Sequence, residues 1–287
     1  MASVKESSRE LNRGREWRRI VLDAGKLGSV TLRINLPHPL PDAALPVVIV
    51  LGGLETGGRG ACRLIDAGGT VLIGYEWPVR QRLPRGMALW QSLPGLYEHV
   101  LSVPGQIAAA LKWVGAQTWA DGDRITLVGL SLGALAAPAV QRLAAAEGVT
   151  IRWTVLGYGG SPLGSLVSNH PDIEPAALRP LLGRGLGLLL RPVEPSSHLP
   201  HLKGKFLVFG GTDDSLIGPD AARQYAALVP EPKVVRWLQS DHLGVGGGAR
   251  DLLDRVVGET IEWLRARGAV DMSGHSPGRP RLSPEEC

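Results

Sequence analysis

The chain has 287 residues, of which 44% are hydrophobic and 20% are charged, and its formal net charge is +4 at pH 7. A chain this apolar can bury enough surface to offset the entropy of folding, which excludes an intrinsically disordered protein. No apolar run approaches the ~18 residues that cross a bilayer. The basic residues are scattered, unlike the concentrated basic face of a nucleic-acid-binding protein. We therefore expect a globular protein without a nucleic-acid partner and without insertion into a membrane.

The cysteines and the N-terminal sequence bear on the cellular compartment. Cys62 and Cys287 are the only cysteines, which is too few for a disulfide framework, and they form no CxxC pair that would hold zinc. The first twenty residues contain no apolar run of the kind that a secretory signal needs. These features predict a cytoplasmic protein with no bound metal.

The two ends of the chain differ from its middle. Residues 1–14 are polar, and we expect them to be frayed. Residues 271–287 combine proline, glycine and charge without periodicity, which is typical of a disordered tail. The remaining residues, 15–270, are predicted to form one domain.

The predicted elements alternate along this domain. Trp17–Leu22 and Ser29–Asn35, joined through glycines, predict an antiparallel hairpin. Pro46–Leu51 is a β-branched run that ends in two glycines, as expected of a strand buried on both faces. Strands separated by helices then predict the α/β class, with a mostly parallel sheet and helices on both faces. The expected elements then follow in chain order: a helix at Arg59–Ala67, a strand at Thr70–Gly74, an irregular region at Glu76–Val103, a helix at Pro104–Gln117, a strand at Arg124–Gly129, a helix at Leu132–Ala145, strands at Thr150–Leu156 and Lys205–Phe209, a helix at Asp220–Leu228, a strand at Lys233–Leu238 and a helix at Arg250–Arg267.

One long segment, residues 161–203, breaks the alternation. Three glycines interrupt its apolar run Leu181–Leu190, and each glycine costs a helix about 1 kcal/mol relative to alanine. The segment is therefore either a weakly stabilised helix or a mobile flap. Long connections in compact domains are usually functional or disordered, and the apolar content argues against disorder. We interpret 161–203 as a small cap over a pocket, with Leu186 as a pocket-lining residue.

The strongest functional signal is the G-x-S-x-G pattern Gly129-Leu-Ser131-Leu-Gly133, placed between a predicted buried strand and an alanine-rich helix. In such a strand–turn–helix context the serine occupies a tight, strained turn, and the flanking glycines let the two backbones pass closely. The helix N-terminus directs its free N–H groups toward any oxyanion that forms beside the serine. The pattern therefore predicts that Ser131 is a nucleophile.

The segment Asp121-Gly-Asp-Arg124-Ile-Thr-Leu-Val-Gly-Leu-Ser131-Leu-Gly resembles the elbow region of the α/β-hydrolase fold, in particular its serine esterases and its dipeptidyl-peptidase-like and dienelactone-hydrolase-like hydrolases. The resemblance extends from about Arg33 to Arg267. It implies a central sheet flanked by helices, a catalytic triad in the chain order nucleophile, acid, histidine, and no metal or organic cofactor.

A serine hydroxyl needs a base within hydrogen-bond reach. His242 is the best candidate because it follows the predicted strand Lys233–Leu238, and residues just past parallel strands converge at one edge of the sheet. His198 and His201 precede a strand, and His275 lies on the tail.

For the acid, Gly210-Gly-Thr-Asp213-Asp214 follows the strand Lys205–Phe209. It is similar to the G-x-x-D segment of the family, which places the acid on Asp214. The adjacent Asp213 is the competitor. Asp241 is the direct neighbour of the histidine and could reach its ring only through a contorted turn.

The oxyanion formed in acyl transfer needs prearranged donors. One is predicted to be the amide of Leu132. By similarity to the family the second is the amide of Leu54, with Gly53 as the alternative in Gly52-Gly-Leu54. Gly53 also belongs to the predicted substrate-binding residues, together with two tryptophans near the same mouth, Trp77 and Trp90.

These residues predict a serine hydrolase that cleaves carboxylic esters with short- to medium-chain acyl groups. The expected partner is a small-molecule ester, and the oligomeric state is left open. The same residues would also serve an acyl-peptide, amide or thioester hydrolase. A protein that keeps the fold only for binding is the non-enzymatic alternative.

Overall fold

The computed structural model describes residues 2–12, 14–53, 68–77, 87–168, 176–245 and 248–271. The predicted helix at Arg59–Ala67 and the predicted tail beyond Asp271 lie outside these residues. No helix in the described part of the chain is long and apolar enough to cross a membrane.

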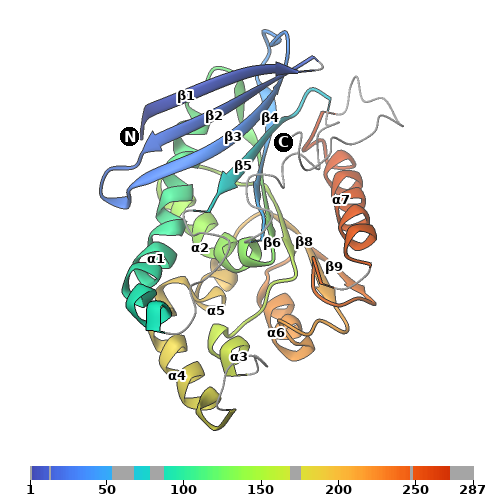
Figure 1. Cartoon of the computed structure of the whole chain (residues 1–287). Helices are drawn as coiled ribbons and strands as arrows, with labels where there is room; N and C mark the ends of the chain where they lie inside the picture. The colour runs from blue at the N-terminus through green and yellow to red at the C-terminus, as the bar shows by residue number, and fades with distance from the viewer. Residues whose placement is uncertain are drawn as a thin grey trace.

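The described strands form one nine-stranded sheet in the order β1-β2-β3-β5-β4-β6-β7-β8-β9 (Figure 1). Neighbours from β1 to β5 pair antiparallel, and those from β5 to β9 pair parallel. The α/β class, the mostly parallel sheet and the N-terminal hairpin are thus confirmed. The strands are β1 Ser3–Asn12, β2 Arg15–Asp23, β3 Ser29–Pro37, β4 Leu45–Leu51, β5 Val71–Glu76, β6 Ala120–Leu130, β7 Trp153–Gly157, β8 Lys205–Gly211 and β9 Lys233–Leu238.

The expectation of a frayed segment 1–14 is wrong for residues 3–12, which form β1 and pair with β2 along its length. The strand is exposed on both faces, so it has no alternation of apolar and polar residues that would predict it. Its order comes from the backbone ladder, supplemented by ion pairs to β2 such as Lys5–Asp23 at 3.1 Å.

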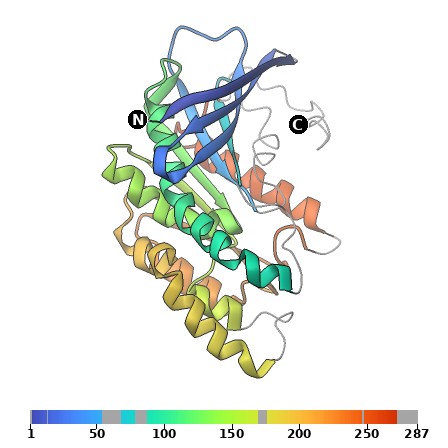
Figure 2. The same ribbon diagram turned by 60° about the vertical axis from the view of Figure 1, so that its left-hand side comes forward.

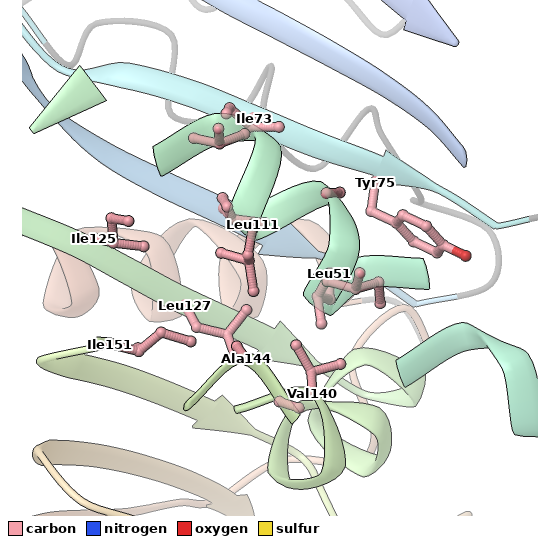
Figure 3. Packing of buried hydrophobic residues seen from close by; sticks show 14 of the residues in the cluster. Leu51, Ile73, Tyr75, Leu111, Ile125, Leu127, Val140, Ala144 and Ile151 are labelled. Atoms are coloured by element: carbon pink, nitrogen blue, oxygen red, sulfur yellow. The ribbon is translucent and has the colours of Figure 1, made fainter. Parts of the chain in front are cut away.

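Alternate side chains of the central strands enter two cores, one on each face of the sheet. In β4, Val47 and Ile49 belong to the first core and Val48 to the second. The first core is covered by α1 (Met87–Gly115), α2 (Leu132–Ala146) and α6 (Pro219–Leu228), and the second by α7 (Ala249–Arg265), which lies across the sheet from α1 and α2 (Figure 1). Figure 3 shows Leu111 of α1 and Val140 of α2 meeting Leu51 and Leu127 of the sheet.

Helix α1 begins at Met87, so the irregular region expected at Glu76–Val103 is wrong from Met87 onward. Helix α1 contains prolines at 94 and 104, each of which removes a backbone donor from the helix. Val103 and Ile107 are buried in the first core, and this packing keeps the helix continuous across Pro104.

Within its described residues, the segment 161–203 contains three short helices, α3 (Leu163–Ser168), α4 (Arg179–Leu189) and α5 (Pro195–His198), and 3-10 turns at Ala176–Leu178, Arg191–Val193 and Leu199–His201. The described residues of the segment are therefore mainly helical, and its role as a cap over a pocket stays a prediction. Gly183 of α4 has a packing reason, since a Cβ there would lie 2.0 Å from the hydroxyl oxygen of Ser168 and 2.5 Å from the carbonyl oxygen of Gly164 in α3. Helices α3 and α4 lie at one end of the molecule, opposite β1 and β2 (Figures 1 and 2).

One buried carboxylate closes the base of this cap. Glu194, after α4, accepts hydrogen bonds from the hydroxyl of Ser161 and from the amide of Leu163, both at 2.8 Å. The same carboxylate caps α5 through the amide of Ser196. The two ends of the α3–α4 hairpin are thus held together at a single point.

Candidate active site

The turn between β6 and α2 holds Ser131 in a backbone conformation that side chains rarely adopt, with φ 54° and ψ −117°. Its amide donates to the carbonyl of Gly157 in β7 at 2.8 Å, which fixes the turn to the neighbouring strand. The glycines of the motif are needed here. A Cβ on Gly129 would lie 2.6 Å from the carbonyl oxygen of Gly133, and a Cβ on Gly133 would lie 1.8 Å from that of Leu51.

The structure brings Ser131, His242 and Asp214 together in one hydrogen-bonded chain. The hydroxyl oxygen of Ser131 lies 2.7 Å from Nε2 of His242, and Nδ1 of His242 lies 2.8 Å from Oδ2 of Asp214. Because a carboxylate oxygen can only accept, Nδ1 carries the proton, and Nε2 is left to accept from the serine hydroxyl. Asp214 and His242 are 2% and 3% exposed, so water does not compete for these bonds.

Asp213 and Asp214 lie side by side in the loop after β8, and their hydrogen bonds show which of them contacts the histidine. Oδ1 of Asp214 accepts the amides of Leu216 and Ile217 at 3.0 and 2.9 Å, which leaves Oδ2 for the histidine. Asp213 is exposed and accepts the hydroxyl of its neighbour Thr212. Of the two, only Asp214 reaches the histidine ring.

Asp241, the neighbour of His242 in the chain, bonds to backbone and to Ser215 instead of to the histidine ring. One of its oxygens, Oδ1, accepts the amide and hydroxyl of Ser215, both at 2.8 Å, and the amide of His242 at 2.7 Å. The hydrogen bonds from Ser215 and from the amide of His242 lower the pKa of this carboxyl below its ordinary value. Asp241 therefore ties the loop that bears the acid to the loop that bears the histidine.

Tyr158, directly after β7, is a further residue of the site that the sequence did not reveal. Within the described residues, it and Ser131 are the two non-glycine residues with positive φ. Its buried ring stands edge-to-face on the imidazole of His242, with the centroids 5.8 Å apart. Its hydroxyl is hydrogen-bonded to that of Ser240 at 2.8 Å, and burial raises its pKa. Only the positive φ distinguishes this tyrosine, and φ cannot be read from a sequence.

The predicted oxyanion donors are only partly described. Leu132 is the first residue of α2, where a backbone amide has no acceptor within the helix. Gly53 follows the end of β4, and Leu54 lies outside the described residues. One predicted donor, the amide of Leu132, therefore lies directly after Ser131. The choice between Gly53 and Leu54 as the second donor stays open.

The predicted pocket residues occupy different surroundings. Trp77 donates its indole N–H to the carbonyl of Gly52 at 3.0 Å and packs edge-to-face on Tyr75 at 5.2 Å, so it supports the loop after β4. Leu186 is half-buried in α4 of the cap. Trp90 lies in α1, and its side chain is outside the described part.

No model of a protein family matches the sequence, and no curated protein matches it. Solved structures resemble it over nearly the whole chain. The acetyl xylan esterase from Paenibacillus sp. R4 has a TM-score of 0.65 at 18% identity, covering 90% of this chain and 88% of that one. A cold-adapted esterase from an Arctic intertidal metagenomic library has a TM-score of 0.61 at 14% identity, covering 91% and 97%.

The 2,6-dihydroxy-pseudo-oxynicotine hydrolase is also similar, with a TM-score of 0.61 at 16% identity, covering 93% of this chain and 70% of that one. At such identities the similarity concerns the fold. Together with the sheet order and the strained serine between β6 and α2, it leads to one conclusion: the chain has the α/β-hydrolase fold.

Proposed function

We propose that the protein is a serine hydrolase that cleaves carboxylic esters through an acyl-enzyme intermediate. The observation that carries this proposal is the hydrogen-bonded chain from Ser131 through His242 to the buried Asp214. Such an arrangement turns a weakly nucleophilic alcohol into a reactive one, because the base is in contact and is itself oriented by a third group.

In the first half of the reaction, the serine oxygen forms a bond to the ester carbonyl carbon while its proton passes to Nε2 of His242. The carbonyl becomes an alkoxide, which the amide of Leu132 and a second amide from Gly53 or Leu54 stabilise. When the alkoxide collapses, the bond to the leaving alcohol breaks, and Nε2 returns the proton to that alcohol. Asp214 remains ionised and stabilises the imidazolium.

In the second half, water attacks the acyl-serine while Nε2 accepts one of its protons. Collapse of this intermediate breaks the bond to the serine oxygen, which takes the proton back, and the carboxylic acid leaves. Each donor to the oxyanion contributes about 3–4 kcal/mol in comparable enzymes. No step requires a metal or an organic cofactor.

We propose esters with short- to medium-chain acyl groups as the substrates. Several structurally similar proteins are named esterases, and two of them are acetyl xylan esterases, which supports an ester with a small acyl group. Amides and thioesters are the second candidates, because the same three side chains would act on them.

The test is covalent labelling combined with turnover. A fluorophosphonate probe is expected to label Ser131, and Ser131→Ala is expected to lose the label and nearly all hydrolysis of p-nitrophenyl acetate. A screen of C2 to C12 esters, with amides and thioesters alongside, then ranks the substrate classes. A folded wild-type protein that takes no label and hydrolyses none of them would be a binding protein, and the proposal would fall.

A further inference from the structure

Helix α4 of the cap turns its leucines toward solvent. Leu181 and Leu188 are 68% and 74% exposed. Three further leucines on the same helix or at its start, Leu178, Leu182 and Leu189, are also exposed. A helix on the surface of a globular domain normally directs such residues inward. In α4, by contrast, the large apolar side chains face away from the domain.

This outward orientation has a clear structural cause. The side of α4 that meets α3 is made of glycine: Gly183 is buried against Ser168 and Gly164, and Gly187 lies against Gly164. At 100° per residue, the exposed leucines then fall on the opposite side, within an arc of about 120°. The small residues provide the packing, and the large apolar residues are left for something outside the chain.

Positive charge borders this leucine face. Arg184 of α4 is exposed and lies on the helix beside the row formed by Leu181 and Leu188. Arg191, in the 3-10 turn that follows α4, is also exposed. Arg179 lies on the other side of the face. Within residues 176–193, which are all described, there is no carboxylate. The face thus combines aliphatic side chains with cationic edges.

A hollow continues the face at the C-terminal end of α4. The hollow is lined by Leu188, Leu189, Arg191 and Pro192, together with Tyr97 of α1 and with Ser197 and His198 of α5. Its chemistry matches that of the helix, because aliphatic surface lies beside a guanidinium and a hydroxyl. An apolar chain with an anionic head would meet complementary groups along this whole stretch.

We propose that α4 is a docking element for an anionic lipid surface. The leucines would enter the boundary between headgroups and acyl chains, and the flanking arginines would pair with lipid phosphates. The position of α4 at one end of the molecule leaves this face accessible to a flat surface (Figures 1 and 2). The docking is peripheral and does not depend on the esterase proposal.

A second copy of the chain fits this face less well. A symmetric pairing of two α4 helices would bring the arginine edges of both copies together, and like charges repel. Residues 176–193 also contain none of the aromatic anchors that dominate binding energy at protein interfaces, where leucine is under-represented. Tyr97 of α1, which lines the hollow, donates its hydroxyl to the carbonyl of Leu189. An anionic lipid removes the repulsion and needs no shaped anchor.

The experiment measures co-sedimentation of the full chain with vesicles of phosphatidylcholine, alone or with 30% phosphatidylglycerol. We expect at least tenfold tighter binding to the anionic vesicles, weakening as salt is raised. The double variant Leu181→Ser/Leu188→Ser is expected to lose at least tenfold in binding. The matched control is Leu11→Ser/Leu40→Ser, which changes two exposed leucines far from α4 and should bind as the wild type does.

Charge is tested in the same assay. Arg184→Glu/Arg191→Glu should abolish the preference for anionic vesicles, whereas Arg250→Glu, an exposed arginine on α7, should not. Equal binding of the leucine variant and the wild type, or no vesicle binding at low salt, would overturn the proposal. So would a dimer seen by sedimentation that disappears in the leucine variant, since the face would then serve self-association.

Discussion

Three aspartates stand close to His242, and their hydrogen bonds separate their roles. Asp214 gives one oxygen to two backbone amides and the other to the ring of the histidine. Asp241 gives one oxygen to Ser215 and to the backbone of His242. Asp213 points to its neighbour Thr212. Only the first of the three touches a group that would move a proton.

Replacing each of these aspartates by asparagine should rank them. Asp214→Asn is expected to lower kcat by about 10³–10⁴-fold, because the amide favours the wrong tautomer of the imidazole. Asp241→Asn keeps an acceptor oxygen and should cost less than tenfold, and Asp213→Asn should be nearly silent. Steady-state kinetics on one p-nitrophenyl ester, with circular dichroism to check the fold, decides this. A larger loss in Asp213→Asn than in Asp214→Asn would move the acid.

At the scale of elements, the site depends on how closely α2 approaches β4. Gly133 is where the two meet, and no side chain fits there without moving backbone. Gly258, inside α7, has nothing within 4 Å of the position where a Cβ would stand. Packing therefore excludes a side chain at Gly133 and leaves room for one at Gly258, although both glycines lie in helices.

Alanine at these two glycines should have opposite effects. Gly133→Ala overpacks the elbow and is expected to destabilise the fold by about 1–3 kcal/mol or more, with loss of activity. Gly258→Ala removes a flexible residue from a helix and should stabilise by about 0.4–1 kcal/mol, with activity unchanged. Urea unfolding of both variants against the wild type measures the difference. A neutral Gly133→Ala would mean that α2 can shift away from β4.

At the scale of the whole molecule, the antiparallel strands extend the sheet well beyond the parallel part. Glu16 of β2 is the charged residue buried in this extension, at 3% exposure, with Arg9 and Arg18 at 2.7 and 2.5 Å. The hydrogen bond from Arg18 and the charges of Arg18, Arg9 and His38 lower the pKa of Glu16 below its ordinary value of 4.5.

This gives the fold a pH dependence with a definite sign. Because the folded-state pKa is lowered, the Glu16 carboxylate stabilises the fold above about pH 4.5, and that contribution is lost as the pH falls through the lowered pKa. Glu16→Gln should therefore unfold more easily than the wild type at pH 7, by on the order of 1 kcal/mol. The difference should shrink below pH 4. Denaturant melts at both pH values provide the check, and a constant difference would contradict the argument.

Much of this architecture follows from local pattern. Buried β-branched runs such as Leu45–Leu51 and the glycines around Ser131 identify the parallel strands and the elbow, because a central strand and a strained turn each restrict which residues fit. The position of His242 just past a strand predicts its place at the site, since the ends of parallel strands converge at one edge of the sheet. The choice of Asp214 over Asp213 rests on its similarity to the G-x-x-D segment of the family.

The remainder depends on contacts that no local pattern contains. β1 is polar on both faces, so its existence depends on β2. Helix α1 contains two prolines, and the packing of Tyr158 on the histidine requires three strands to be in place. The glycines of α4 weaken it as an isolated helix, and Gly183 and Gly187 are accommodated because they pack against α3.

The polar strand β1 also bears on how the chain can be shortened. It covers the outer edge of β2, and its register shift between Val4 and Glu6, together with its charged side chains, makes it a poor template for further strand addition. Trimming the first twelve residues would uncover a row of unpaired amides and carbonyls on β2 and would take Arg9 away from Glu16. Such a truncated protein is expected to aggregate edge to edge, even though nothing near the serine has been touched.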